Sequence, residues 1–107
     1  MVKILIRPLS SNRAWQGRRF KSSAYKAYEE QLGYLLPARY PIHETRALKI
    51  TIEAGFSNKL SDLDNICKQF IDVLQKVYKF NDNRINEIHL FKEIVDKGQE
   101  YIAFEIV

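Results

Sequence analysis

The chain has 107 residues, of which 46% are hydrophobic and 28% are charged, and its single cysteine, Cys67, excludes an intrachain disulfide. A chain of this length and composition is expected to form one globular domain whose core needs neither a disulfide nor a structural metal. The apolar stretches are too short to span a membrane, and the N-terminus lacks the apolar core of a signal peptide. We therefore expect a soluble cytoplasmic protein with no membrane partner.

Charge is distributed unevenly along the chain. Residues 1–49 carry ten Lys/Arg and three Glu, and residues 50–107 carry seven Lys/Arg and ten Asp/Glu, so net charges of +7 and −3 sum to +4. A nuclease can use such a division, with cations that bind phosphate and carboxylates that hold a divalent metal. The alternative is a small basic protein that binds no nucleic acid.

The first half of the chain predicts a strand, a helix and a second strand. Residues 2–7 are rich in β-branched and long aliphatic side chains and end at a proline, which is typical of a short strand. Residues 9–23 are polar and basic and have no regular period. Tyrosines and leucines at helical spacing predict a helix over residues 22–36, and alternation of apolar and polar residues predicts a strand over 46–56.

The second half predicts one long helix and two strands. Apolar residues recur at steps of three and four over about residues 62–77, which predicts an amphipathic helix. Strands are predicted over 85–95 and 101–107, joined by a glycine-containing hairpin turn at 96–99. The order β-α-β-α-β-β predicts a single α+β domain with a mixed sheet and two main helices packed on it.

Two carboxylates one residue apart, Asp62 and Asp64, mark the start of the long helix. Asp62 lies before the regular helix and Asp64 in its first turn, so both can face one divalent cation. The alternative is structural, because acids interact favourably with the positive end of a helix dipole, and Ser61 with Asp64 resembles a capping box. Lys68, four residues after Asp64, is also placed for a plain ion pair on the same helix face.

The segment DLDNICKQFIDVLQKVYKFNDNRINEIHLFK, residues 62–92, resembles the RusA family of Holliday junction resolvases. The family's hallmark is an Asp-Leu-Asp-Asn-x-x-Lys run that opens a helix, a later Asp-x-Leu, an acid in the following turn and a strand that ends in Lys. The matching residues here are Asp62, Leu63, Asp64, Asn65, Lys68, Asp72, Leu74, Asp82 and Lys92. The amino end agrees through Pro8, Ser11, Asn12, Arg13 and Trp15.

The match departs from the family pattern at two places. Residues 34–45 agree by position alone, and many relatives carry two acids in the turn where this chain has Asn81 and Asp82. We assign the third acid to Asp82 rather than Asn83, because a carboxylate offers Mg²⁺ a charged oxygen.

The resemblance implies a homodimeric, Mg²⁺-dependent endonuclease that cuts four-way junction DNA by paired symmetric nicks during recombination or repair, and that is often encoded by prophages. Asp62, Asp64 and Asp82 would hold the metal, for which Mn²⁺ is a possible substitute. The metal would activate a water molecule and polarise the phosphate, and Lys68 would supply positive charge to the transition state. Asn65 would bind a metal-coordinated water or cap the helix, and Lys92 would have a supporting role.

The basic N-terminal segment is the predicted DNA-binding element. Its lack of a regular period suits a flexible arm that becomes ordered on phosphate, although a basic loop is often merely solvated. Trp15 would stack or wedge at the junction centre, or else fold back into the core. The residues assigned to DNA contact are Asn12, Arg13, Trp15, Arg18, Arg19 and Lys21.

The position of the third acid raises a geometric question. A helix over residues 62–77 is ~24 Å long, so Asp82 is expected near the end opposite Asp62 and Asp64. One chain would then assemble all three acids poorly. A two-fold axis that crosses antiparallel copies of the helix predicts an active site shared between subunits.

Two other classes of function stay open from the sequence. One is a non-catalytic protein of phage origin that binds branched or single-stranded nucleic acid, and the other is an interaction protein whose acidic helix face binds a basic partner. His43 and His89 have no paired ligand spacing and are interpreted as non-catalytic. Cys67 is interpreted as a buried small hydrophobe.

Overall fold

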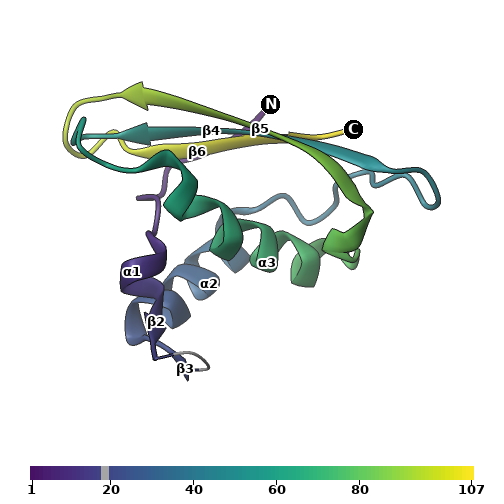
Figure 1. Ribbon diagram of the computed structural model, residues 1–107, viewed down its shortest axis with the longest axis horizontal. Helices are drawn as coiled ribbons and strands as arrows, with labels where there is room; N and C mark the ends of the chain where they lie inside the picture. The colour runs from purple at the N-terminus through teal and green to yellow at the C-terminus, as the bar shows by residue number, and fades with distance from the viewer. Residues whose placement is uncertain (18–19) are drawn as a thin grey trace.

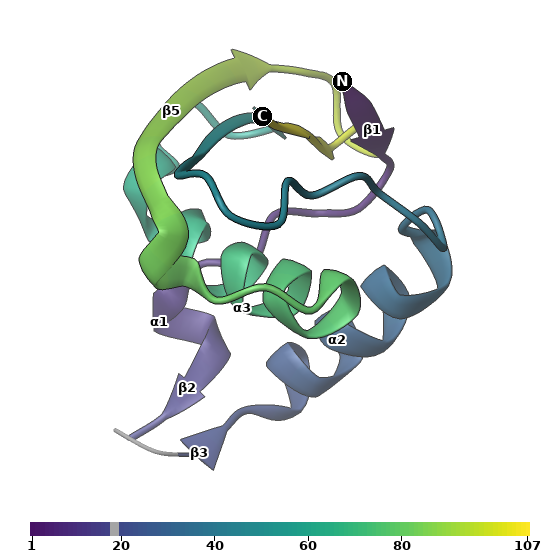
Figure 2. The ribbon, with the colours of Figure 1, turned by 90° about the vertical axis from the view of Figure 1, so that its right-hand side faces the viewer.

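In the described residues, 1–17 and 20–107, a four-stranded mixed sheet forms one layer of the computed structural model and three α-helices form the other. The helices cover the same face of the sheet in both perpendicular views (Figure 1, Figure 2). A sheet with one apolar face needs such a cover, because that face must be removed from water. The predicted single α+β domain with a mixed sheet and two main helices is confirmed.

The sheet has the strand order β1-β6-β4-β5. β1 (Val2–Ile4) pairs antiparallel with β6 (Tyr101–Ile106), which pairs antiparallel with β4 (Leu48–Phe56). β4 in turn pairs in parallel with β5 (Ile85–Ile94), which lies at the edge of the sheet. The four predicted strands are thus confirmed, although β1 ends at Ile4, where its pairing with β6 ends, rather than at the predicted Arg7.

The predicted hairpin at residues 96–99 is wrong. A turn does form there, since Gly98 has a positive φ of 92° and the Gln99 amide donates to the Asp96 carbonyl at 2.9 Å. The strands on either side of it are not neighbours, however, because β4 lies between β5 and β6. Turn residues determine where the chain reverses, but the long apolar β4 takes the central place that decides which strands pair.

The first long helix, α2 (Ser23–Leu35), lies within the predicted boundaries. The hydroxyl of Ser22 accepts a hydrogen bond from the Tyr25 amide at 3.1 Å and so caps the helix N-terminus. The helix ends before Pro37, as its ring cannot continue an α-helix.

The second long helix begins as a 3₁₀ turn, η1 (Leu63–Ile66), and continues as α3 (Cys67–Tyr78). The predicted capping box is wrong: Asp62 is the N-cap residue of η1, and no side chain caps that turn. α3 ends at Lys79, whose φ of 58° is left-handed, and the chain then enters a short 3₁₀ turn, η2 (Asp82–Arg84).

The described part of the N-terminal segment contains short regular elements where the sequence predicts none. It contains a single helical turn, α1 (Ser11–Ala14), and two short antiparallel strands, β2 (Trp15–Gln16) and β3 (Phe20–Lys21). Each strand is two residues long, which is too short to leave a periodic pattern in the sequence. Arg18 and Arg19 lie outside the described residues.

The core lies between the sheet and the helices. It consists of the inward-facing side chains of β4 and β6 packed against α2 and α3, and its largest fully buried members include Tyr25, Leu32, Ile50, Ile52, Phe70, Leu74, Ile102 and Phe104. In the part of the chain that the structure describes, no helix is long and apolar enough to cross a membrane.

Gly55 is required by close packing between β4 and β6. It pairs directly with Tyr101, and a Cβ atom added at Gly55 would lie 2.4 Å from two carbon atoms of the tyrosine ring. The ring is itself held in place, because its hydroxyl donates to Glu53 at 2.9 Å.

Gly55→Ala is therefore expected to lower the free energy of unfolding by about 1–3 kcal/mol, as measured by urea denaturation. Gly33 in α2 is a matched control, because an added Cβ would meet no atom within 4 Å. Gly33→Ala should raise the free energy of unfolding by about 0.5–1 kcal/mol through its helix propensity. Equal effects at the two glycines would contradict the packing argument.

Candidate active site

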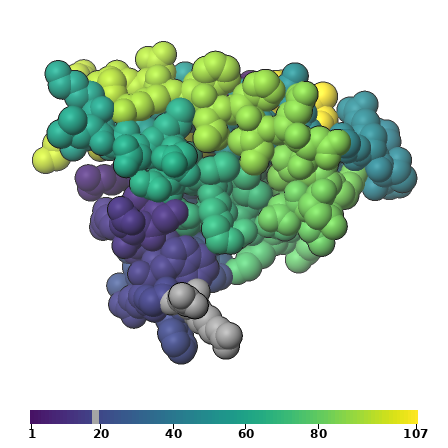
Figure 3. Space-filling model, in the orientation of Figure 1, coloured from purple at the N-terminus to yellow at the C-terminus, as the bar shows by residue number. Residues whose placement is uncertain are grey.

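The basic N-terminal segment and the acidic start of the long helix are joined by a buried amide. Gln69, in α3, is fully buried, and its Nε2 donates to the carbonyl oxygens of Leu9 at 2.7 Å and Asn65 at 2.8 Å. The Ser11 hydroxyl lies 3.0 Å from both the Gln69 Oε1 and the Asn65 carbonyl. Segments more than fifty residues apart in sequence are thus held side by side, and Figure 3 shows their purple and teal surfaces in contact.

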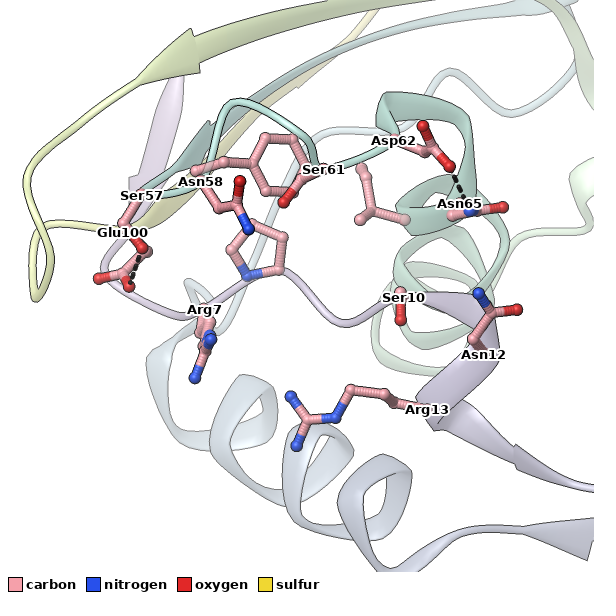
Figure 4. A pocket seen from close by; sticks show the side chains of 13 residues that line it. Arg7, Ser10, Asn12, Arg13, Ser57, Asn58, Ser61, Asp62, Asn65 and Glu100 are labelled. Atoms are coloured by element: carbon pink, nitrogen blue, oxygen red, sulfur yellow. Dashed lines mark hydrogen bonds between the residues drawn. The ribbon is translucent and has the colours of Figure 1, made fainter.

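Asp62 lines a polar pocket of about 280 Å³ on one side of η1 (Figure 4). The opposite wall is formed by the N-terminal segment, which contributes Asn12 and Arg13. The Asn65 amide group is 3.4 Å from the Asp62 carboxylate and donates a hydrogen bond to it. The Asn65 side chain is therefore placed to orient Asp62 and does not cap the helix, which was one of the two predicted roles.

Asp64 faces a different pocket, of about 400 Å³, which lies between α3 and the inner face of β5. Lys68, Asp72 and Asp82 line the same pocket. The Lys68 Nζ is 3.7 Å from the Asp72 carboxylate, so the predicted ion pair of Lys68 forms with Asp72 rather than with Asp64. The Lys68 side chain is 68% exposed and is accessible to a ligand in this pocket.

Asp82 reaches this pocket because the chain turns back after α3. Its backbone amide donates to the Gln75 Oε1 at 2.9 Å, so Asp82 lies beside the third turn of the helix. From Cys67 to Gln75 the helix rises ~12 Å. Asp64 and Asp82 therefore line one pocket of the same chain, although they belong to the turns that come before and after α3.

Asp62, Asp64 and Asp82 are exposed carboxylates, and such oxygen donors fit the ligand preference of Mg²⁺ or Mn²⁺. Within residues 1–17 and 20–107, however, no three His, Cys, Asp or Glu side chains are gathered closely enough to hold one ion. One protomer therefore carries suitable donors in two neighbouring pockets without bringing them to a single point.

Lys92 holds the loop that leads into the acidic segment. Its Nζ donates to the carbonyl oxygens of Lys59 at 2.8 Å and Ser61 at 2.6 Å, and lies 5.7 Å from the centre of the Phe56 ring. Lys92 is thus a positioning residue, because it holds the backbone immediately before Asp62.

Comparison with protein-family models matches residues 7–105 to the family described as Endodeoxyribonuclease RusA. The match includes both the N-terminal basic segment and the acidic start of the long helix. The chain belongs to the RusA family. It is an endodeoxyribonuclease of a family that acts on branched DNA junctions, which confirms the predicted enzyme class over the two non-catalytic alternatives. No curated protein sequence matches the chain.

Two of the DNA-binding residues predicted from the RusA resemblance are open to solvent beside Asp62. Asn12 and Arg13 are exposed and lie in α1, at the edge of the polar pocket. Their position agrees with a role in DNA binding, which stays a prediction. The prediction for Arg18 and Arg19 concerns residues outside the described part of the chain.

Trp15 and Lys21 are engaged within the protein. The Trp15 ring is half-buried and packs edge-to-face on Tyr25 with centroids 5.1 Å apart, as in the predicted alternative that it folds back on the core. The Lys21 Nζ lies 2.8 Å from the Glu29 carboxylate and 4.9 Å from the centre of the Tyr25 ring. If Trp15 or Lys21 contacts DNA, it does so through the part of its side chain that these internal contacts leave accessible to solvent.

Arg7 and Gln69 were missed by the sequence predictions. Arg7 lines the same polar pocket as Arg13, but the sequence places it at the end of a predicted strand, with no signal of a site. Gln69 did leave a signal, because it is a polar residue three positions after Ile66 and four before Val73, on the buried face of the helix. A glutamine on that face must find internal hydrogen-bond partners.

The two histidines and the cysteine have no catalytic geometry in the described residues. The Nδ1 of His43 accepts hydrogen bonds from two backbone amides of its own loop, and His89 lies 3.5 Å from Glu87 on the outer face of the sheet. Cys67 is half-buried rather than fully buried, and burial raises the pKa of its thiol, which keeps it protonated.

Glu29, in α2, forms ion pairs that connect this helix with β3 and with α3. Its two carboxylate oxygens lie 2.8 Å from the Nζ atoms of Lys21 in β3 and Lys76 in α3. Partial burial alone would raise the pKa of Glu29, but the hydrogen bonds and charges of the two lysines lower it below its ordinary value.

Glu29→Gln is expected to lower the free energy of unfolding by about 1 kcal/mol at neutral pH, because both ion pairs are lost. Since the folded-state pKa is lowered, this stabilisation is complete above the ordinary pKa of a carboxyl group and is lost as the pH falls through the lower folded value. The difference between the two proteins should disappear as the pH is lowered from about 7 to about 3, as measured by urea denaturation. A difference that persists in acid would contradict the electrostatic explanation.

Proposed function

We propose that this chain is a Mg²⁺-dependent Holliday junction resolvase that acts in the cytoplasm and cuts four-way DNA by paired symmetric nicks in recombination or repair. The observation that carries the proposal is the pair of hydrogen bonds from the Gln69 amide to the carbonyl oxygens of Leu9 and Asn65. They hold the basic N-terminal segment against the exposed acids Asp62 and Asp64. Cations beside carboxylates suit a reaction in which phosphate must be bound and a divalent metal must be held. The family match restricts the reaction to hydrolysis of a DNA phosphodiester.

In this proposal Asp62, Asp64 and Asp82 hold Mg²⁺, or Mn²⁺ in its place. When bound, the metal supplies Lewis-acid activation of the phosphate and lowers the pKa of a coordinated water molecule. The protein's part is to position these carboxylates: Asn65 orients Asp62 through its hydrogen bond, and Lys92 holds the preceding backbone.

Lys68 is proposed to stabilise the charge that develops on the phosphate. It lies one helical turn after Asp64 in a pocket that opens to solvent, where its ammonium group is tethered by Asp72 at 3.7 Å. As water attacks phosphorus and the bond to the 3′-oxygen breaks, negative charge accumulates on the phosphoryl and leaving oxygens. A lysine that is already positioned stabilises this charge without further reorganisation.

We also propose that the active form is a homodimer that pairs through β5. This ten-residue edge strand has one side without a neighbouring strand in the described sheet. Ile88, Phe91 and Ile94 along it are 48%, 55% and 52% exposed, which is unusual for large apolar side chains on an edge strand. A second copy in antiparallel pairing would cover these residues and satisfy the free backbone groups.

Such pairing supports a shared active site. Lys92 brings the end of β5 next to the loop before Asp62, whereas Asp82 comes directly before the start of the strand. Because antiparallel neighbours run in opposite directions, the start of one β5 lies beside the end of the other. Asp82 of each protomer would then approach Asp62 and Asp64 of its partner and complete the carboxylate set that one chain does not gather.

Asp62→Asn, Asp64→Asn and Asp82→Asn should each abolish nicking of a labelled four-way junction in Mg²⁺ while leaving junction binding in EDTA intact or slightly tighter. The reason is that an amide is a poor metal ligand but repels phosphate less than a carboxylate does. Asp96→Asn, at an exposed turn, is the matched control and should cut at the wild-type rate. Normal cleavage by all three variants would refute the assignment of the acids.

Mixing the Asp64→Asn and Asp82→Asn homodimers tests the shared site. If each site takes Asp82 from the partner, a heterodimer has one intact site and one that lacks both acids, so nicking of one strand should reappear after subunit exchange. Exchange is followed independently with differently labelled subunits. Complete exchange without recovered nicking would show that each site belongs to one chain.

A further inference from the structure

Two arginines, Arg7 and Arg13, line the same pocket as Asp62. Arg7, between β1 and α1, and Arg13, in α1, both line the polar pocket and also a second, shallower pocket against α2. Among the described residues, the ion pairs within 4.0 Å use lysines or His89, and none uses either arginine. Figure 4 shows the two guanidinium groups on the same side of the pocket, with Arg13 directed toward Arg7.

The backbone on which these arginines stand is fixed. Arg7 is followed by Pro8, whose ring restricts the chain, and by Leu9, whose carbonyl is bound by Gln69 at 2.7 Å. The carbonyl of Arg13 accepts a hydrogen bond from the Ser22 hydroxyl at 2.5 Å, which ties α1 to the cap of α2. These backbone contacts keep both arginines at one pocket, where their side chains are exposed.

The carboxylate of Glu100, which lines the same pocket, accepts its hydrogen bonds from groups other than the two arginines. The donors are the Ser57 hydroxyl at 3.0 Å and the Gly98 amide at 2.7 Å. Hydrogen bonds from its own backbone amide and from Ser57, together with the positive charge of Arg7, lower the pKa of the Glu100 carboxyl, so it stays ionised. In the described residues, Glu100 therefore forms no ion pair within 4.0 Å with Arg7 or Arg13, and this side of the pocket stays positively charged.

We infer that Arg7 and Arg13 form a binding subsite for one backbone phosphate of DNA, next to the phosphate that is cut. This inference rests on the proposed nuclease function. Guanidinium groups bind phosphate oxygens through paired hydrogen bonds, and an anion between two of them removes their mutual repulsion. The pocket has a volume of about 280 Å³, and most of its lining side chains are polar or charged.

The subsite and the acids lie on opposite walls of one pocket, as Figure 4 shows for Asp62 and the arginines. Because Asp62 lines the same pocket, a strand that places one phosphate between Arg7 and Arg13 would have Asp62 and η1 within its further course. The subsite therefore determines where along the strand the reacting phosphate falls, so its loss is expected to affect the position of the nick as well as affinity.

The subsite is tested directly by following the arginine Nε–Hε signals in nuclear magnetic resonance spectra of the whole protein during titration with the tetranucleotide d(TTTT). The signals of Arg7 and Arg13 should shift saturably, whereas that of Arg39, an exposed arginine in the loop before β4, should not. A d(TTTT) with neutral methylphosphonate linkages should produce no shift. Absence of a shift at Arg7 and Arg13, or equal shifts with the neutral analogue, would overturn the inference.

Junction binding in EDTA provides a second measurement. Arg7→Gln and Arg13→Gln should each weaken binding about tenfold and reduce the slope of log K against log salt by ~0.9, because one phosphate contact is lost. Arg39→Gln should match the wild type. If both pocket variants bind like Arg39→Gln, the subsite is refuted while the nuclease proposal stands. If wild-type protein neither binds nor nicks junctions, the proposed function fails, and the tetranucleotide titration still decides the phosphate subsite.

Discussion

The fully buried side chain of Gln69 is the constraint on which the rest of the site depends. Its amide must be hydrogen-bonded, because a buried amide without partners costs on the order of 1–3 kcal/mol. The partners that it finds, the carbonyl oxygens of Leu9 and Asn65, belong to the basic N-terminal segment and to the acidic η1 turn. The same interaction that satisfies the core therefore sets the distance between the cations and the carboxylates.

The charge asymmetry along the sequence becomes a division across η1 in space. Asp62 lines the pocket that contains the N-terminal arginines, whereas Asp64 lines the pocket between α3 and β5 that contains Lys68. Asp62 and Asp64 are two positions apart on this turn and line two neighbouring pockets that meet at η1. A DNA strand that crosses this turn would meet positive charge on one side and carboxylates in the middle.

The sheet ends in an incompletely covered strand. α3 packs beneath β4 and β6, so the inner face of β5 is left partly open, and Lys92 bridges the gap to the loop before Asp62. Long exposed edge strands are avoided in monomeric proteins, because their free backbone groups pair with other chains. In the proposed dimer, this exposed edge of β5 would bring the acids of a second chain close to those of the first.

The sequence by itself determined the two long helices and the four strands of the main sheet, and with them the acidic residues at the start of the second long helix, because hydrophobic periodicity is a local property. Tertiary structure decided what depends on distant segments: that β4 separates β5 from β6, that Lys68 pairs with Asp72, and that Asn65 contacts Asp62. Tertiary structure also decided that Gln69 binds the N-terminal segment and that Arg7 and Arg13 line the same pocket. These features arise from packing between parts of the chain up to about sixty residues apart, for which a linear pattern carries no distance information.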